Sequence, residues 1–236
     1  MRSDHWKVGL ALGLSWNAGF VDAVGYIALY RVFVANMTGN TIALGVGWAQ
    51  GDWNLFFRRG AAIPVFVLGM ILSRWAIHVA KRMQMSLLPA VIYALEALLL
   101  MLFIVIGMDT VIEGKVQTDS LLRYSLLVAL PSLAMGLQNA MLTHFGPYDL
   151  HTTHVTGILA KFADECAQFF MWFRDRTRGR NKLRLGKVLA VSWRQATLRN
   201  ALTLGIVWLS YAIGAGSGAL LMLEWKLLAL AFPISS

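Results

Sequence analysis

Asp22 is an acidic residue whose position is hard to explain by helix packing alone. It lies midway along an otherwise apolar stretch, Val8–Tyr30. A carboxylate in such a setting is costly unless it is paired or protonated, so acids inside apolar spans are candidates for function. A low-dielectric site favours the protonated acid, which would let Asp22 bind and release a proton near neutral pH. The structural alternative is that Asp22 hydrogen-bonds a neighbouring broken segment and fixes the fold.

The sequence Thr38-Gly39-Asn40 follows Asp22 and has the residue types of a helix break. Gly39 tolerates unusual backbone angles, while Thr38 and Asn40 can satisfy freed backbone groups or cap a new helix. Unpaired N–H groups at such a helix start attract anions or polar substrate atoms. A purely structural kink is the alternative interpretation.

Asn139 and the pair Thr156-Gly157 repeat this arrangement in the second half of the chain. Asn139 stands in a Gly-x-x-Asn-Ala motif, as Asp22 stands in Gly-x-x-Asp-Ala. The spacing from the acid or amide to the glycine of the Thr-Gly pair is 17 residues in the first half and 18 in the second. Matching order and spacing indicate an internal duplication. Because Asn139 cannot titrate, a proton-coupled Asp22 would make the two halves chemically unequal.

His154 adjoins the second Thr-Gly pair, and His144, Asp149 and His151 lie nearby in the sequence. A definite metal-ligand set is lacking, so polar contacts lining a cavity or a proton relay are favoured over a metal site. The chain contains no nucleophile elbow, P-loop, dinucleotide fingerprint or HExxH motif. We therefore expect neither an enzyme nor a bound cofactor or metal.

Glu96 is a second lone acid, inside the apolar stretch Leu87–Met108. Contact with a neighbouring helix is the simpler interpretation, and a second proton site is the alternative. The small-residue runs Gly9-x-x-x-Gly13 and Gly214–Gly218 predict close approach of helices.

The elements that carry these residues are predicted from hydropathy. The chain is 58% hydrophobic and only 14% charged, whereas soluble domains carry about 25% charged residues. A helix needs about 20 mostly apolar residues to cross a bilayer. Five stretches qualify: Val8–Tyr30, Gly60–Val79, Leu87–Met108, Leu121–Leu142 and Ala201–Leu223. We predict an all-α integral membrane protein with six transmembrane helices, or five and a truncated sixth at Leu227–Pro233.

The charge distribution predicts the orientation in the membrane. The loop 174–199 holds nine basic residues and one acid, which is +8 of the net charge of +9. The positive-inside rule places this loop and the N-terminus in the cytoplasm and the acidic loop 109–119 outside. A basic loop also suggests nucleic acid, but its position beside membrane spans explains the charge without one. The same charge favours contact between Arg174–Arg199 and anionic lipid.

Two polar-interrupted stretches, Asn36–Gln50 and Thr152–Phe173, are simplest as broken or re-entrant segments. A full crossing by the second would place the basic loop outside. With three crossings per half, repeat 1 (about 8–108) and repeat 2 (about 121–234) would have opposite orientations within a single membrane domain, 1–236. This 3+3 inverted repeat is common in secondary transporters.

The motifs around Asp22, Val34–Asn40, Asn139 and Thr153–Gly157 resemble those of the bacterial YoaK-like family, and the resemblance covers nearly the whole chain. It implies a multi-pass protein of the bacterial plasma membrane, presumed to transport a small molecule whose identity is unknown. A non-transporting scaffold or regulator that acts through the basic cytoplasmic loop is the competing hypothesis.

Overall fold

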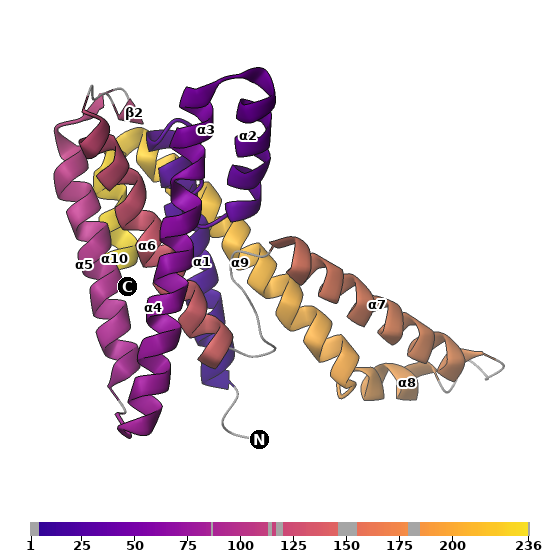
Figure 1. Cartoon of the computed structure of the whole chain (residues 1–236). Helices are drawn as coiled ribbons and strands as arrows, with labels where there is room; N and C mark the ends of the chain where they lie inside the picture. The colour runs from indigo at the N-terminus through magenta and orange to yellow at the C-terminus, as the bar shows by residue number, and fades with distance from the viewer. Residues whose placement is uncertain are drawn as a thin grey trace.

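The computed structural model describes residues 5–85, 87–112, 115–116, 120–145, 155–178 and 185–235, and these are almost entirely helical (Figure 1). Two strands of two residues each, β1 (Val111–Ile112) and β2 (Lys115–Val116), pair antiparallel between α5 and α6. The helices are α1 (His5–Ala28), α2 (Met37–Gln50), α3 (Trp53–Gly60), α4 (Ala62–Arg82), α5 (Leu88–Met108), α6 (Leu121–Phe145), α7 (Val155–Thr177), α8 (Leu185–Ser192), α9 (Ala196–Trp225), η3 (Lys226–Leu230) and α10 (Ala231–Ser235).

Five helical segments of the described chain are long and apolar enough to cross a membrane. They are Trp6–Ala28, Trp53–Arg82, Leu88–Met108, Leu121–Met141 and Ala196–Pro233. Each overlaps one of the five predicted stretches, so the prediction of an all-α integral membrane protein is confirmed. The second span begins at Trp53 rather than at the predicted Gly60, because the arginines of α3 lower the local hydropathy although the helix continues through them.

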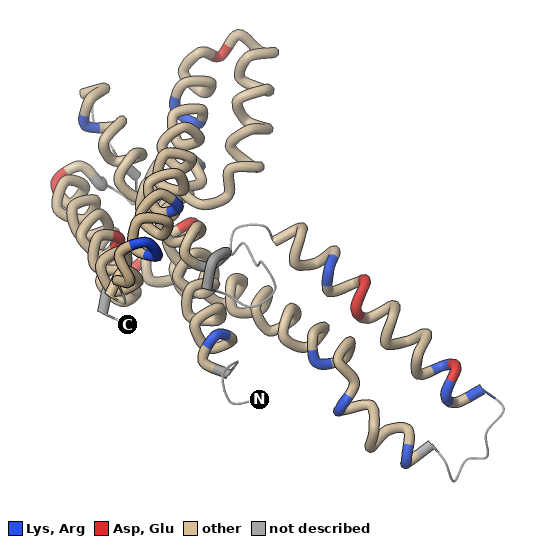
Figure 2. Tube along the Cα trace, turned by 60° about the horizontal axis from the view of Figure 1, so that its bottom comes forward, with Lys and Arg blue, Asp and Glu red and all other residues tan. Residues whose placement is uncertain are grey.

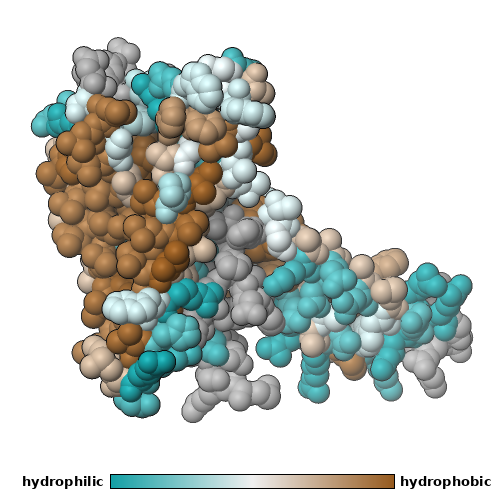
Figure 3. Space-filling model, in the orientation of Figure 1, coloured by the Kyte–Doolittle hydropathy of each residue, from teal (hydrophilic) through white to brown (hydrophobic). Residues whose placement is uncertain are grey.

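The surface of the helical bundle is apolar where α4 and α5 face outward. Figure 3 shows a continuous brown area over these two helices. Large side chains there are exposed, including Ile71 and Trp75 of α4 and Leu98 and Val105 of α5. An apolar surface of this extent is unfavourable in water and suits the hydrocarbon core of a bilayer.

The sixth predicted span, Leu227–Pro233, is short in the structure. From the end of α9, η3 and α10 turn back toward the middle of the bundle (Figure 1). Leu227, Ala229 and Leu230 are buried there. The described part of the chain therefore has five long spans and a truncated sixth, which is one of the two predicted alternatives.

Helices α1 and α9 pack so closely that two glycines are required. A Cβ atom on Gly19 would collide with the carbonyl oxygen of Tyr211 in α9. A Cβ atom on Gly214 would collide with the carbonyl oxygen of Trp16 in α1. Each glycine thus lies against a backbone carbonyl of the partner helix, as expected of small-residue membrane interfaces.

Helices α4 and α6 pack in the same way. A Cβ atom on Gly136 of α6 would collide with the carbonyl oxygen of Phe66, and one on Gly69 of α4 would lie 2.5 Å from the carbonyl oxygen of Leu133. In both helix pairs the glycine of each helix stands three residues after the carbonyl that its partner glycine contacts.

The N-terminal small-residue run has a different environment. A Cβ atom on Gly9 or Gly13 would meet nothing within 4 Å. The prediction of close helix approach at Gly9-x-x-x-Gly13 is therefore wrong, although it holds at Gly214 and Gly218. Gly9 and Gly13 instead border open space, which belongs to a pocket described below.

Helix α7, α8 and the first half of α9 form an arm that extends away from the bundle, with α7 packed along α9 (Figure 1). Lys and Arg residues occur along the arm and toward its far end (Figure 2). The second expected re-entrant segment is thus a 23-residue helix in this arm. The arm, the start of α1 and the α4–α5 turn lie toward one end of the molecule, and β1–β2 lie at the other (Figure 1).

Candidate functional site

The chain reverses direction after α1 and re-enters the bundle. Tyr30 and Arg31 have positive φ angles of 54° and 65°, which turn the backbone back. The backbone N–H groups of Val34 and Ala35 then donate to Oδ1 of Asp22 at 2.8 and 2.9 Å. Asp22 lies six residues before the end of α1, so the chain returns by about 9 Å along that helix. A re-entrant segment is present at the first predicted break.

Helix α2 starts inside the bundle and returns to the end of the molecule where α1 finishes (Figure 1). Its 14 residues span about 21 Å, which is less than the roughly 30 Å hydrocarbon core. Asn36 is its N-cap, and the Asn36 side chain accepts a hydrogen bond of 3.3 Å from the N–H of Gly39. The cap is therefore Asn36 rather than Thr38 or Asn40, and the Thr38 side chain is exposed.

Asn40 holds the re-entrant loop closed. Its Oδ1 accepts from the N–H of Phe33 at 3.0 Å, and its Nδ2 donates to the Phe33 carbonyl at 2.6 Å. The side chain is completely buried. Gly39 lies against the Phe33 ring, where a Cβ atom would be 2.6 Å from Cε2. Gly39 and Asn40 thus both contact Phe33 and fix the backbone segment just before α2.

Asp22 is itself buried, with 3% of its surface exposed. Besides Val34 and Ala35, the N–H of Asn36 donates to Oδ1 at 3.5 Å, and the Tyr211 hydroxyl of α9 donates to Oδ2 at 2.9 Å. A carboxylate beside a helix N-terminus is stabilised by the helix dipole and by the free N–H groups there. The N–H groups of Val34, Ala35 and Asn36 are therefore held by Asp22 and are not free to bind a substrate anion.

The predicted site residues of the second half do not form a comparable cluster in the described part of the chain. Asn139 is buried in α6, where its Nδ2 lies 3.3 Å from the sulfur of Met70 in α4. Thr156 and Gly157 lie in the first turn of α7 and are exposed. His154, like the neighbouring His151 and Asp149, lies outside the described residues.

Glu96 belongs to a polar cluster that was not predicted from the sequence. Its Oε1 accepts from Nδ2 of Asn17 at 2.9 Å and from Nε2 of Gln138 at 3.0 Å, which joins α5 to α1 and α6. Contact with neighbouring helices, the simpler interpretation, is thus observed. Asn17 and Gln138 could have been singled out as polar residues within apolar spans, by the rule that identified Asp22.

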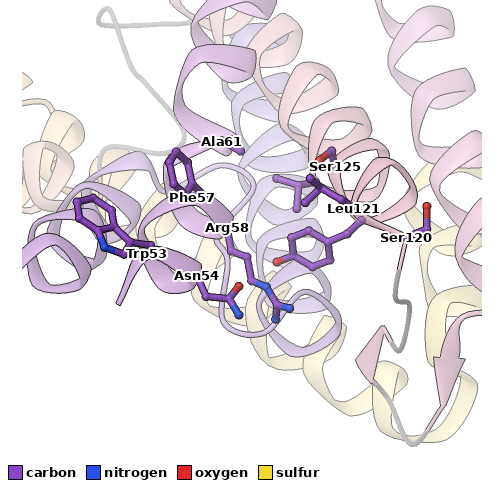
Figure 4. A pocket seen from close by; sticks show the side chains of 10 residues that line it. Trp53, Asn54, Phe57, Arg58, Ala61, Ser120, Leu121 and Ser125 are labelled. Carbon is purple, nitrogen blue, oxygen red and sulfur yellow. The ribbon is translucent and has the colours of Figure 1, made fainter. Parts of the chain in front are cut away.

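Glu96 and Asn17 also line a pocket of about 660 Å³ between α1, α5 and α9. A second pocket of about 670 Å³ lies between α3 and the start of α6 (Figure 4). There the Arg58 guanidinium lies 5.1 Å from the Tyr30 ring centroid and 5.0 Å from that of Tyr124. None of the predicted site residues that the structure describes lines either pocket.

The fold and this site define a polytopic helical membrane protein with a re-entrant segment pinned by a buried carboxylate. The family model "Protein of unknown function (DUF1275)" matches residues 10–235. The chain therefore belongs to the DUF1275 family.

The UPF0700 transmembrane protein YoaK of Bacillus subtilis (strain 168) is 28% identical to this chain over 155 residues, a match that covers 64% of each protein. The chain thus spans a little under two thirds of that relative's length. No solved structure matches the chain. The resemblance to the YoaK-like family is confirmed.

Proposed function

We propose that this protein is a small-molecule transporter of the bacterial plasma membrane, built as an inverted repeat of residues 8–108 and 121–234. The observation that carries the proposal is the matching packing of two helix pairs. Helix α1 of the first half packs on α9 of the second, and α6 of the second half packs on α4 of the first. Inverted repeats related in this way let one part of a transporter rock against another.

The correspondence extends to individual backbone contacts. Gly19 contacts the Tyr211 carbonyl as Gly136 contacts the Phe66 carbonyl. Gly19 and Gly136 are also the first residues of the motifs that contain Asp22 and Asn139. The duplicated sequence pattern and the duplicated helix contacts therefore coincide, which supports the repeat.

The two pockets support transport because they lie in opposite halves of the bundle. The Glu96 pocket includes Gly9, Gly13 and Trp16 from the first half of α1. The Arg58 pocket includes Ser120, Leu121, Tyr124, Ser125 and Val128 at the start of α6, which begins at the other end of the molecule (Figure 1). Alternating access needs openings toward both sides of a membrane.

A proton-coupled form of the proposal uses Asp22. Protonation would remove the charge that holds the N–H groups of Val34, Ala35 and Asn36, and so would weaken the attachment of α2 to α1. The re-entrant segment would then move in response to a proton. Tyr211 would transmit that change to α9, because its hydroxyl contacts the same carboxylate.

The competing proposal is a scaffold or regulator that acts through the basic arm. It is favoured by the position of the arm, which extends clear of the bundle and carries Lys and Arg (Figure 2). In either case we propose that the N-terminus and the loop 174–199 are cytoplasmic and that the loop contacts anionic lipid. We propose neither an enzyme nor a nucleic-acid-binding protein.

Concentration-jump currents from proteoliposomes separate the two proposals. Benzylamine, benzoate and an uncharged sugar represent cationic, anionic and neutral solutes, and counterflow of labelled sugar replaces the current for the neutral one. A transporter gives a protein-dependent signal with at least one solute class. A scaffold gives no protein-dependent signal with any of the three solute classes.

A further inference from the structure

The pocket between α1, α5 and α9 contains one acidic side chain among otherwise uncharged lining residues. Its walls include Leu10, Leu14, Trp16, Ala97 and Leu100. Tyr93, Ser210 and Asn17 add polar atoms, and Glu96 adds a carboxylate. Neither Lys nor Arg is among the residues that line it, so the carboxylate has no cation beside it in the pocket.

Glu96 is 4% exposed, and its hydrogen bonding is one-sided. Oε1 accepts both available amide donors, from Asn17 and Gln138. Oε2 is buried and has no hydrogen-bond partner in the described part of the chain, and the same is true of Oδ1 of Asn17. Two hydrogen-bond acceptors on pocket-lining residues therefore remain without a donor.

A buried carboxylate that has no cation beside it and one oxygen without a hydrogen-bond donor is unfavourable in a protein interior. A buried neutral acceptor without a donor, such as Oδ1 of Asn17, is also unfavourable, but its free-energy cost is smaller. A ligand with a positive charge and N–H donors would supply both the missing cation and the missing hydrogen-bond donors. An anion or a pure hydrogen-bond acceptor would supply neither.

The walls of the pocket distinguish an organic cation from a bare metal ion. Calcium takes six to eight oxygen ligands and magnesium six, and the described residues hold no metal-type cluster of His, Cys, Asp and Glu. Leucine side chains suit an apolar ligand body, and the rings of Trp16 and Tyr93 suit an ammonium group. The volume of about 660 Å³ falls in the usual range for small-molecule sites.

We propose that this pocket binds a small organic ammonium ion with an apolar body, whose N–H groups reach Oε2 of Glu96. That this ligand is the transported substrate rests on the proposed transport function, whereas its binding to the pocket does not. Binding and transport are therefore measured separately.

Three probes of matched size test the charge requirement on the purified full-length protein. Benzylamine, benzyl alcohol and benzoate share a phenyl ring and differ in the charge of the attached group. Isothermal titration in detergent is expected to show saturable binding of benzylamine and none of the other two. No benzylamine binding, or equal binding of all three, would overturn the proposal.

Two variants test the location. Glu96→Gln keeps an oxygen that can accept from Asn17 and Gln138 but removes the charge, and it should weaken benzylamine binding at least tenfold. Gly13→Leu fills the pocket from a position where added atoms meet open space, and it should abolish binding. Gly216→Leu is the matched control, since Gly216 also has open space and lines neither described pocket.

Gly13→Leu decides the result if Glu96→Gln does not fold. Wild-type affinity in Gly13→Leu, or in a folded Glu96→Gln, would place benzylamine elsewhere and overturn the proposal. Binding without protein-dependent uptake would contradict transport alone. Uptake of another solute class without benzylamine binding would contradict the ammonium site alone.

Discussion

The hydroxyl of Tyr211 donates a 2.9 Å hydrogen bond to Oδ2 of Asp22, across 189 residues of sequence. This contact connects α9 to the same carboxylate that holds Val34 and Ala35 in the re-entrant loop. One side chain therefore links a long span of the second half to the broken segment of the first. We therefore expect changes at Asp22 to affect contacts in both halves of the bundle.

Replacement of Asp22 separates its hydrogen bonding from its charge. Asp22→Asn keeps an oxygen for the three backbone donors and presents an amide to the Tyr211 hydroxyl, so the protein should fold with a modest loss of stability. Asp22→Leu leaves those buried donors unsatisfied, at about 1–3 kcal/mol each, and should unfold at a much lower temperature. Thermal unfolding in detergent measures both. Equal melting temperatures for Asp22→Asn and Asp22→Leu would show that the carboxylate does not hold the break.

Tyr211→Phe removes one hydrogen bond to a carboxylate. The expected loss is about 1.5–3 kcal/mol, since hydrogen bonds to charged groups are the stronger ones. Tyr26→Phe is the matched control, because Tyr26 of α1 is also half-buried and its hydroxyl makes no hydrogen bond with the described residues. A loss of stability in the control as large as that in Tyr211→Phe would contradict a specific role for the contact.

Gly39→Ala tests the packing of the first Thr-Gly motif. Alanine normally stabilises a helix by about 1 kcal/mol over glycine, but a Cβ atom here would press on the Phe33 ring. We expect Gly39→Ala to be destabilised relative to Gly45→Ala, a control in the same helix where nothing lies within 4 Å. Phe33→Leu should restore part of the loss in Gly39→Ala. If Gly39→Ala and Gly45→Ala have the same melting temperature, the ring does not restrict this position.

The matching helix pairs predict matching sensitivity. In Gly214→Ala and its counterpart Gly69→Ala the new methyl group meets a backbone carbonyl, which cannot move without separating the helices. Each should lose about 1–3 kcal/mol, as overpacked contacts do. Gly216→Ala in the same helix as Gly214 should be neutral or stabilised. Tolerance of Gly69→Ala together with intolerance of Gly214→Ala would argue against equivalent pairs.

Cysteine labelling tests the orientation. On a Cys166→Ala background, cysteine at position 113 should react with an impermeant maleimide added to intact cells. Cysteine at position 180 should react only after permeabilisation, because the positive-inside rule places it in the cytoplasm. The reverse pattern would invert the proposed topology.

The long spans and the residue at the break were predictable because each has a local signature. Hydropathy identifies five spans, and Asp22 stands out as an acid in an apolar stretch. The re-entrant course of α2 was also predictable, since Met37–Gln50 is too short to cross. These features depend on composition over one element.

The partners of these residues were not predictable, because they depend on how distant elements meet. Nothing in the sequence pairs Tyr211 with Asp22 or Gln138 with Glu96. The cap at Asn36 carried a local signal, an asparagine just before the helix, but Thr38 and Asn40 competed with it for that role. The stacking of Arg58 between Tyr30 and Tyr124 likewise requires three separate segments.

Solute uptake into proteoliposomes tests the proposed transport function most directly. Cationic, anionic and neutral solutes are each supplied with and without an imposed pH gradient, to wild-type protein and to Asp22→Asn. The account predicts protein-dependent uptake of at least one solute class, accelerated by the gradient in wild type and unaffected by it in Asp22→Asn. No uptake above that of protein-free liposomes, from protein that keeps its normal melting temperature, would contradict it.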